Sequence, residues 1–233
     1  MASAAEIKVL SSPPLRTVIE ELAPRFERAT NYKLVIKTGA VKDLKQQIDA
    51  GTAFDVAILT PSLINALVED GKIAAAGLAS IARSGLGVVV RAGGHCPDVD
   101  SVDAFKRALL GAKSVMYASG SAVMAHIEHT FARLGIADEI RAKSKMLAAG
   151  GYIAKAIAAG TAELGLTTIP VILETREAKF VGPFPPELQF YVDLSGGVST
   201  GSRQPDCAQA LIRHLMAAEA TQVFHAKGLE RTH

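Results

Sequence analysis

Cysteine is scarce in this chain, and its scarcity argues against a cysteine metal cluster and against a small disulfide-stapled fold. The sequence has 233 residues but only two cysteines, Cys96 and Cys207. Two cysteines without a CxxC spacing do not form a cysteine metal cluster, and small disulfide-stapled folds use many more. We therefore expect two free thiols, with a single disulfide as the alternative.

An excess of charge is also lacking. The 25 lysines and arginines almost balance the 23 aspartates and glutamates, for a net charge of +2. Nucleic acids and acidic lipids attract basic patches, and no such patch is visible, so neither is an expected partner. No stretch approaches the ~18 uninterrupted apolar residues that span a bilayer, so we expect no membrane insertion.

The residues that are present alternate between short apolar runs and helical periodicity. Such alternation indicates an α/β fold with a mainly parallel sheet covered by helices on both faces. Expected strands cover residues 7–10, 33–37, 54–59, 85–91, 114–117, 145–147, 163–168 and 188–194. Expected helices cover residues 13–30, 41–50, 61–70, 102–110, 121–134 and 152–159, with one or two more over 205–226.

The length corresponds to about one and a half domains of ~150 residues, which suits two small lobes. A proline-rich stretch at 183–186 and a turn near 83–85 are the expected crossings between them. We therefore predict one lobe of residues 1–84 plus 191–233 and a second lobe of residues 85–190. We expect a monomer.

Four corners join an expected strand to an expected helix through small or hydroxyl-bearing residues. In open α/β sheets, ligands bind beyond the carboxyl ends of the strands, where helix N-termini favour anions. Each corner can equally be an ordinary helix cap, because serine and threonine are preferred caps. The four corners are Ser11-Ser12, Thr38-Gly39-Ala40, Ala118-Ser119-Gly120-Ser121 and Gly150-Gly151-Tyr152.

The usual catalytic motifs are missing: there is no GxSxG, HExxH, GxxxxGK[ST] or strand-following GxGxxG. His126 and His129 lie three residues apart on an expected helix, but no ligand set completes a metal site around them. We therefore expect neither a metal nor a cofactor. Three cations lie near the corners and are candidates for pairing with an anion: Arg16, Lys42 and Arg83.

The N-terminus carries Ala2-Ser3-Ala4, the pattern after which a signal peptidase cuts, although no charged and apolar leader precedes it. Two origins are consistent with this pattern. One is a mature exported, periplasmic protein behind a start methionine, which we favour slightly. The other is a cytoplasmic protein with an alanine-rich start.

Several segments resemble the molybdate-binding periplasmic protein family. The likeness extends over nearly the whole chain, and it implies a type 2 periplasmic-binding-protein fold with two lobes hinged around a ligand cleft. The segments are Lys8-Val9-Leu10-Ser11-Ser12, residues 20–27, Phe54-Asp55-Val56-Ala57, residues 160–165 and residues 224–229.

The resemblance also implies which residues bind an oxyanion. Hydroxyl and amide groups would come from Ser11 or Ser12, Gly39, Ser119 and the Gly151-Tyr152 turn. The full set of candidate ligand-binding residues is Ser11, Ser12, Thr38, Gly39, Arg83, Ser119, Gly120, Ser121, Gly151, Tyr152 and Thr168.

The chain departs from that family at two donor positions. The family commonly has a second serine where this chain reads Thr38-Gly39-Ala40, and a tyrosine where it reads Gly165-Leu166-Thr167-Thr168. The chain is more similar to a divergent branch of which Arg83-Ser84-Gly85-Leu86-Gly87-Val88 is typical. Some proteins of similar appearance are aconitate isomerases, which makes a small polycarboxylate a second candidate ligand.

Three function classes follow. The first is a solute-binding protein that closes on a small anion and delivers it to ABC transporter membrane subunits. The second is an isomerase that shifts the double bond of an unsaturated tricarboxylate, with His126, Tyr152 or Lys155 as candidate acid–base groups. The third is an interaction module, which is the weakest of the three because it gives the polar strand-to-helix corners no function.

Overall fold

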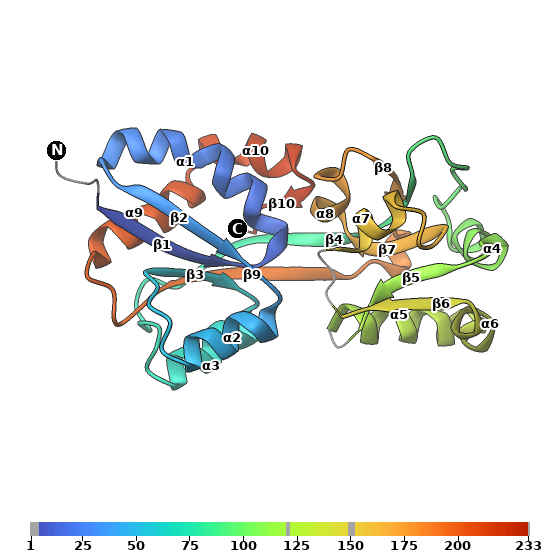
Figure 1. The fold of residues 1–233 in the computed structure, drawn as a ribbon, viewed down its shortest axis with the longest axis horizontal. Coiled ribbons are helices and arrows are strands. Elements are labelled where there is room, and N and C mark those ends of the chain that lie inside the picture. Colours follow the sequence, from blue (N-terminus) through green and yellow to red (C-terminus); the bar gives the residue numbers. More distant parts are fainter. Residues whose placement is uncertain (1–4, 120–121, 149–151, 233) are drawn as a thin grey trace. The chain divides into compact units, whose positions relative to one another are not determined.

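The computed structural model describes residues 5–119, 122–148 and 152–232 and has the predicted α/β architecture (Figure 1). The strands are β1 (Glu6–Ser11), β2 (Lys33–Thr38), β3 (Val56–Leu59), β4 (Ala79–Arg91), β5 (Val115–Ala118), β6 (Ser144–Leu147), β7 (Leu164–Thr168), β8 (Ala178–Pro183), β9 (Tyr191–Val198) and β10 (Leu229–Glu230). The α-helices are α1 (Arg16–Thr30), α2 (Val41–Asp49), α3 (Pro61–Glu69), α4 (Val102–Gly111), α5 (Ala122–Arg133), α6 (Ala137–Ala142), α7 (Ile153–Ala158), α8 (Ile169–Leu173), α9 (Pro205–Met216) and α10 (Thr221–Ala226). The described residues also contain the 3₁₀ turns η1 (Pro13–Leu15), η3 (Pro186–Leu188) and η4 (Ala218–Ala220).

The chain divides into two compact units. Unit 1 contains Met1–Arg83 and Asp193–His233, and unit 2 contains Ser84–Val192. The chain therefore passes from one unit to the other twice, once within β4 and once within β9.

Unit 1 is built on three neighbouring parallel strands, with β1 between β2 and β3. β9 continues the sheet antiparallel to β3, and β4 follows β9. Helices α2 and α3 cover one face, while α1, α9 and α10 lie on the other (Figure 1). The core under α2 and α3 consists of apolar side chains from the helices and from β1 and β3: Leu10, Leu44, Ile48, Phe54, Ala57, Leu59, Leu63, Ile64, Leu67 and Ile73.

The sequence explains why α1 packs as it does. Val18, Ile19, Leu22 and Phe26 recur at helical spacing and are all buried, so one stripe of the helix faces the sheet. Asn31 ends the helix in the left-handed conformation, with φ of 61°, a conformation that asparagine tolerates better than most residues.

Unit 2 repeats the layered plan. β5 is parallel to both β6 and β7, while β4 is antiparallel to β7 on one side and to β8 on the other. Helices α4, α5 and α6 pack on one core cluster, which includes Phe105, Tyr117, Ile127 and Phe184. Helices α7 and α8 supply Ile153, Ile157, Val171 and Ile172 to a second cluster, which also contains Val89 and Met116 from the sheet.

The sequence prediction missed α6, α8 and β8, three short elements without a complete period of their own. It also took the region near 83–85 for a turn, whereas β4 runs through it as a continuous strand. Gly85 lies within this strand beside Gln189, whose amide nitrogen lies 3.3 Å from where a Cβ on Gly85 would stand. Gln189 accepts from the Leu86 N–H over 2.8 Å and donates to the Leu86 carbonyl over 3.1 Å, as a neighbouring strand would.

None of the helices in the described part of the chain combines the length and the apolar character needed to cross a bilayer.

Candidate functional site

The carboxyl ends of three parallel strands meet at one edge of unit 1. Ser11, the last residue of β1, pairs with Thr38, the last residue of β2, and with Ile58 of β3. The Ser12 N–H donates to the Ile58 carbonyl over 2.9 Å, and the Gly39 N–H lies 3.4 Å from the Ser11 carbonyl. These contacts hold two of the predicted corners, Ser11-Ser12 and Thr38-Gly39, next to each other at the edge where α/β proteins bind ligands.

Ser12 stands out among the polar residues of this edge. It is 3% exposed, and its Oγ has no hydrogen-bond partner in the described structure. It precedes η1, which leads into α1, yet its side chain does not cap the helical turn. Leaving a buried hydroxyl unsatisfied costs ~1–3 kcal/mol. An anion bound here would accept from this hydroxyl and benefit from the partial positive charge of the helix start.

The neighbouring corner is more open. Gly39 and Ala40 lead into α2 without a side-chain cap, so the first N–H groups of that helix have no side-chain acceptor. A Cβ on Gly39 would meet nothing closer than Leu44, at 3.4 Å. Lys42, the second residue of α2, is exposed and makes no ion pair with any described residue. This corner therefore combines accessible amides with a cation.

The sequence analysis missed a third corner at the same edge. Thr60 directly follows β3 and precedes α3, but its side chain makes no capping bond. Its Oγ1 lies 3.4 Å from the Oγ of Ser62. Pro61 between them was taken only as a helix start, and the same Thr-Pro-Ser sequence could have identified two hydroxyls beside a helix N-terminus.

Unit 2 has a corresponding edge, because β5, β6 and β7 run parallel and end on the same side. Ser119 follows β5, where its N–H and Oγ donate to the Leu147 carbonyl over 2.8 and 3.3 Å. Thr168 ends β7 and precedes α8 without capping it. Four residues of the predicted corners, Gly120, Ser121, Gly150 and Gly151, lie outside the described residues.

Two of the candidate acid–base residues lie at the start of α7. Tyr152 precedes the helix and is 61% exposed, and the Lys155 Nζ lies 6.0 Å from the centre of its ring. Both side chains are accessible at the strand-end edge of unit 2. They are therefore free to contact a ligand.

The side chain of the third acid–base candidate, His126, is engaged in contacts within unit 2. Its Nε2 lies 2.8 Å from the Leu188 carbonyl, and its ring stacks on Phe190 at a centroid distance of 4.8 Å. The imidazole thereby holds the segment between η3 and β9 against α5.

Two of the predicted cations are paired with carboxylates. Arg83 contacts Glu230 of β10, with Nη2 and Nε at 2.6 and 2.8 Å from one carboxylate oxygen. Arg16, the first residue of α1, pairs with Glu20 at 2.9 Å. These contacts offset part of each positive charge, so Lys42 is the most available of the three cations.

Two cavities lie elsewhere in the units. One of about 270 Å³ in unit 2 is lined by the polar side chains of His95, Asp98, Arg107 and Glu163 together with apolar side chains. The other, of about 300 Å³, lies beside the turn from α1 to β2 in unit 1. Neither cavity includes a residue of the two strand-end edges.

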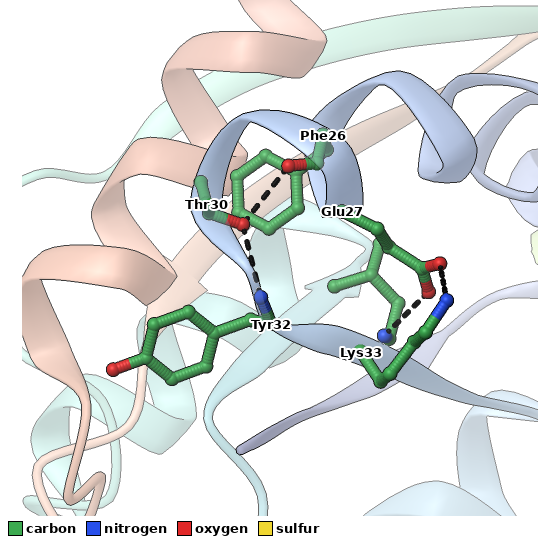
Figure 2. A network of polar contacts seen from close by, with 6 residues as sticks. Phe26, Glu27, Thr30, Tyr32 and Lys33 are labelled. Carbon is green, nitrogen blue, oxygen red and sulfur yellow. Dashed lines mark hydrogen bonds and ion pairs between the residues drawn. The ribbon is translucent and has the colours of Figure 1, made fainter. Parts of the chain in front are cut away.

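The turn beside the second cavity is held by a polar network (Figure 2). Glu27 of α1 accepts from the Lys33 ammonium over 2.6 Å and from the Leu34 N–H over 2.9 Å. These two contacts lower the pKa of the Glu27 carboxyl, and the hydrogen bond from Lys33 has the larger effect. Thr30 donates to the Phe26 carbonyl over 2.9 Å. The network is a structural link between helix and strand.

Among the described residues, no group of three or more histidine, cysteine, aspartate or glutamate side chains is arranged to hold a metal ion. Cys96 and Cys207 are free thiols. Burial raises the pKa of the Cys207 thiol, which keeps it protonated and unreactive at neutral pH.

The arrangement of the strand ends can be compared with known proteins. Residues 7–230 match the bacterial extracellular solute-binding protein family. The chain belongs to this family.

Two curated relatives are informative. The chain is 29% identical to aconitate isomerase from Pseudomonas sp. over 229 residues, which cover 96% of this chain and 87% of the relative. It is 26% identical to the molybdate-binding protein ModA of Azotobacter vinelandii over 239 residues, which cover 97% and 90%.

The fold agrees with these relationships. The structure of the periplasmic molybdate-binding protein of Azotobacter vinelandii matches with a TM-score of 0.81 at 18% identity, over 97% of this chain and 100% of that one. The substrate-binding domain of a putative molybdenum ABC transporter from Clostridium difficile matches with a TM-score of 0.76 at 15% identity, over 98% and 100%. The fold is therefore the type 2 periplasmic-binding-protein fold that the family resemblance implied.

Proposed function

We propose that this protein captures a small anion, either an oxyanion or a di- or tricarboxylate, between its two units and delivers it to the membrane subunits of an ABC transporter. The observation that carries the proposal is the buried, unpartnered hydroxyl of Ser12 at the strand-end edge of unit 1. Family membership supports the binding role, and the names of the relatives support an anionic ligand. Each unit has a strand-end edge of its own, and the proposal is that hinge closure surrounds the ligand with their hydroxyl and amide donors.

Neutral hydrogen-bond donors suit this task. Hydroxyls and helix-start amides bind an anion strongly when water is excluded, because hydrogen bonds to charged groups are worth ~1.5–3 kcal/mol. They also release it when the units open and water returns. The proposed donors are Ser11, Ser12, Thr38 and Gly39 in unit 1, and Ser119, Tyr152, Thr168 and the 120–121 and 151 amides in unit 2. We propose that the protein acts as a monomer, without a cofactor, in the periplasm.

Isothermal titration calorimetry tests the proposal directly. The purified chain is titrated with molybdate, sulfate, succinate, citrate, cis-aconitate and trans-aconitate. We expect saturable binding of at least one of these anions, with the affinity lost in Ser12→Ala. Ser80→Ala provides the control, because Ser80 is exposed and its hydroxyl already bonds to Thr232 at 2.8 Å. Absence of binding to every anion in the panel would reject the proposal.

A second candidate function is favoured by the 29% identity to an aconitate isomerase. Isomerisation requires a base to take a proton from one carbon, the double-bond electrons to shift, and a proton to be returned to another carbon. Tyr152 and Lys155 are the accessible groups for such proton transfer, while helix starts would stabilise the intermediate's negative charge.

This candidate is tested by incubating the protein with cis-aconitate and following the trans isomer by chromatography. Conversion that disappears in Tyr152→Phe or Lys155→Met would establish the isomerase with that residue in its machinery. A rate equal to the protein-free background would reject it and leave the binding function.

A further inference from the structure

We propose that Gln189 is a positioning residue for closure, because its side-chain amide fastens together the unit 2 ends of the two strands through which the chain passes between its units. These crossing strands are β4 and β9, which are neighbours in the sheet. Closure on a ligand has to bend both of them, since a hinge consists of the few residues that connect the moving bodies. The inference rests on the proposed function and concerns a side chain that is not among the proposed ligand donors.

The fastening joins positions close to the two crossings. Unit 2 begins at Ser84 and ends at Val192, so Leu86 and Gln189 are two and three residues inside it. The Gln189 amide oxygen accepts from the Leu86 N–H over 2.8 Å, and the amide nitrogen donates to the Leu86 carbonyl over 3.1 Å. The same oxygen accepts from the Phe190 N–H over 2.9 Å. One side chain thus holds a residue beside the first crossing while standing beside the second.

β4 needs a partner at this point because its pairing with β8 stops there. The register ends with Gly87 opposite Pro183, and Leu86 is fully buried. A buried backbone N–H requires an acceptor, and Gln189 supplies one. A carboxamide carries a donor and an acceptor side by side, as a backbone peptide does. Gln189 therefore extends the hydrogen bonding of β4 by one residue toward the crossing.

The backbone that carries Gln189 is itself fixed to α5. Arg133 donates to the backbone carbonyl of Glu187 over 2.9 Å, and the His126 Nε2 lies 2.8 Å from the Leu188 carbonyl. These two carbonyls belong to the residues directly before Gln189. The amide is therefore presented from a backbone that is anchored within unit 2, and the fastening extends that anchoring to both crossing strands.

Confining the bend lowers the entropic cost of closure. With Leu86 and Gln189 joined, the residues left to bend are 83–85 in β4 and 190–193 at the start of β9. A hinge of few residues has fewer open conformations, so less conformational freedom is lost when a ligand closes the units. We therefore expect ligand affinity to depend on the Gln189 amide although this group does not contact the ligand.

Calorimetric titration of the six anions named above into the wild-type protein, Gln189→Met and Gln189→Glu at pH 8 tests the inference. Methionine has a similar length without the amide, and an ionised glutamate keeps the shape but cannot donate. Fixing one freed backbone residue again on closure should weaken binding by about tenfold in each variant. Gln222→Met is the matched control, because Gln222 is exposed on α10. Circular dichroism melting verifies that each variant is folded.

Small-angle X-ray scattering supplies a readout that a purely structural role would not move. Without ligand, the radius of gyration of both Gln189 variants should differ from that of the wild type, because their crossings bend over more residues. At saturating concentrations of the tightest-binding anion the radii should coincide, since the closed form is common to all three proteins. Hydrogen bonds that only stabilised unit 2 would change the melting temperature and leave the affinity and both radii as they are.

The outcomes separate this inference from the proposed function. Wild-type affinity in both folded Gln189 variants overturns the positioning role and leaves the solute-binding function standing. A ligand-free radius of gyration equal to that of the wild type overturns it as well. If the wild-type protein binds none of the six anions, the proposed function fails, and this inference fails with it.

Discussion

At the scale of single residues, the molecule contains a pair of serines with similar positions and different roles. Ser101 precedes α4 and accepts the Ala104 N–H over 3.2 Å, so it is a conventional helix cap. Ser12 precedes η1 and α1 but caps nothing and is buried without a partner. Both are Ser-before-helix corners in the sequence. Their hydrogen bonds therefore separate a structural serine from a candidate binding serine.

This contrast yields a prediction for two alanine substitutions. Ser101→Ala should lower the free energy of unfolding by ~1 kcal/mol because the cap is lost. Ser12→Ala should leave it unchanged or raise it by up to ~1 kcal/mol because an unsatisfied hydroxyl is removed. Urea unfolding of the ligand-free protein measures both. A loss of stability in Ser12→Ala equal to that in Ser101→Ala would contradict our interpretation of Ser12.

At the scale of elements, the contact between α7 and β7 depends on a glycine. Gly165 lies in β7, and a Cβ there would stand 2.7 Å from side-chain carbons of Ile157 and Val89. The isoleucines of α7 thus pack directly on the strand backbone. The close approach fixes α7, and with it Tyr152 at its start.

We predict that Gly165→Ala lowers the free energy of unfolding by about 1–3 kcal/mol, the usual cost of overpacking a core. Gly111→Ala is the matched control. It lies at the end of α4 with no atom within 4 Å of the new methyl group, and alanine is the better helix former. Thermal unfolding of both variants measures the difference, and equal melting temperatures would contradict the packing argument.

The turn from α1 to β2 is a second element-scale feature, with a predicted pH dependence. Hydrogen bonds from Lys33 and Leu34 lower the Glu27 pKa below its ordinary value of 4.5. A carboxyl whose pKa is lower in the folded than in the unfolded state stabilises the fold at pH values above its unfolded pKa. That stabilisation is lost as the pH falls through the folded value.

Glu27→Gln should therefore reduce stability at pH 7, by less than ~1 kcal/mol because Lys33 is exposed. Towards pH 3 the difference in unfolding free energy between wild type and the variant should narrow, because the wild-type carboxyl becomes protonated. Urea unfolding at the two pH values measures this change. Glu69→Gln is the control, because Glu69 is exposed and forms no ion pair with a described residue. A gap that stayed constant with pH would argue against the network in Figure 2.

At the scale of the whole molecule, the two units differ in how the chain builds them. Unit 2 is one continuous segment, Ser84–Val192, and both of its core clusters draw only on that segment. Unit 1 needs two segments that are far apart in the sequence. Unit 2 therefore has the closed core of a domain that can fold by itself.

We predict that a fragment of residues 84–192 folds cooperatively, whereas a fragment of residues 1–83 does not, because it lacks β9 and α9. Circular dichroism with urea unfolding distinguishes the two. A sigmoidal transition is expected for the first fragment and a gradual one for the second. Gradual unfolding of fragment 84–192 would show that its core requires unit 1.

Much of this protein was readable from the sequence because apolar periodicity dictates which faces must be buried. The pattern was sufficient to predict α/β layering, most strands and helices, and the corners at Ser11-Ser12 and Thr38-Gly39. It was insufficient for short elements such as α8, whose five residues complete barely more than one helical turn. The expected turn near Gly85 is a continuous strand, in which Gln189, over a hundred positions away, hydrogen-bonds to the backbone of the neighbouring Leu86.

Tertiary structure alone decided which polar residues are committed and which are available. The sequence alone does not distinguish the polar residues Arg83, His126 and Ser12. In the folded chain Arg83 pairs with a carboxylate and His126 contacts a backbone carbonyl, whereas the Ser12 hydroxyl has no hydrogen-bond partner. Folding likewise placed Ser11 opposite both Thr38 and Ile58, because strand pairing joins residues that periodicity cannot relate. Local sequence determines the elements, whereas hydrogen-bond partners come from segments distant in the chain.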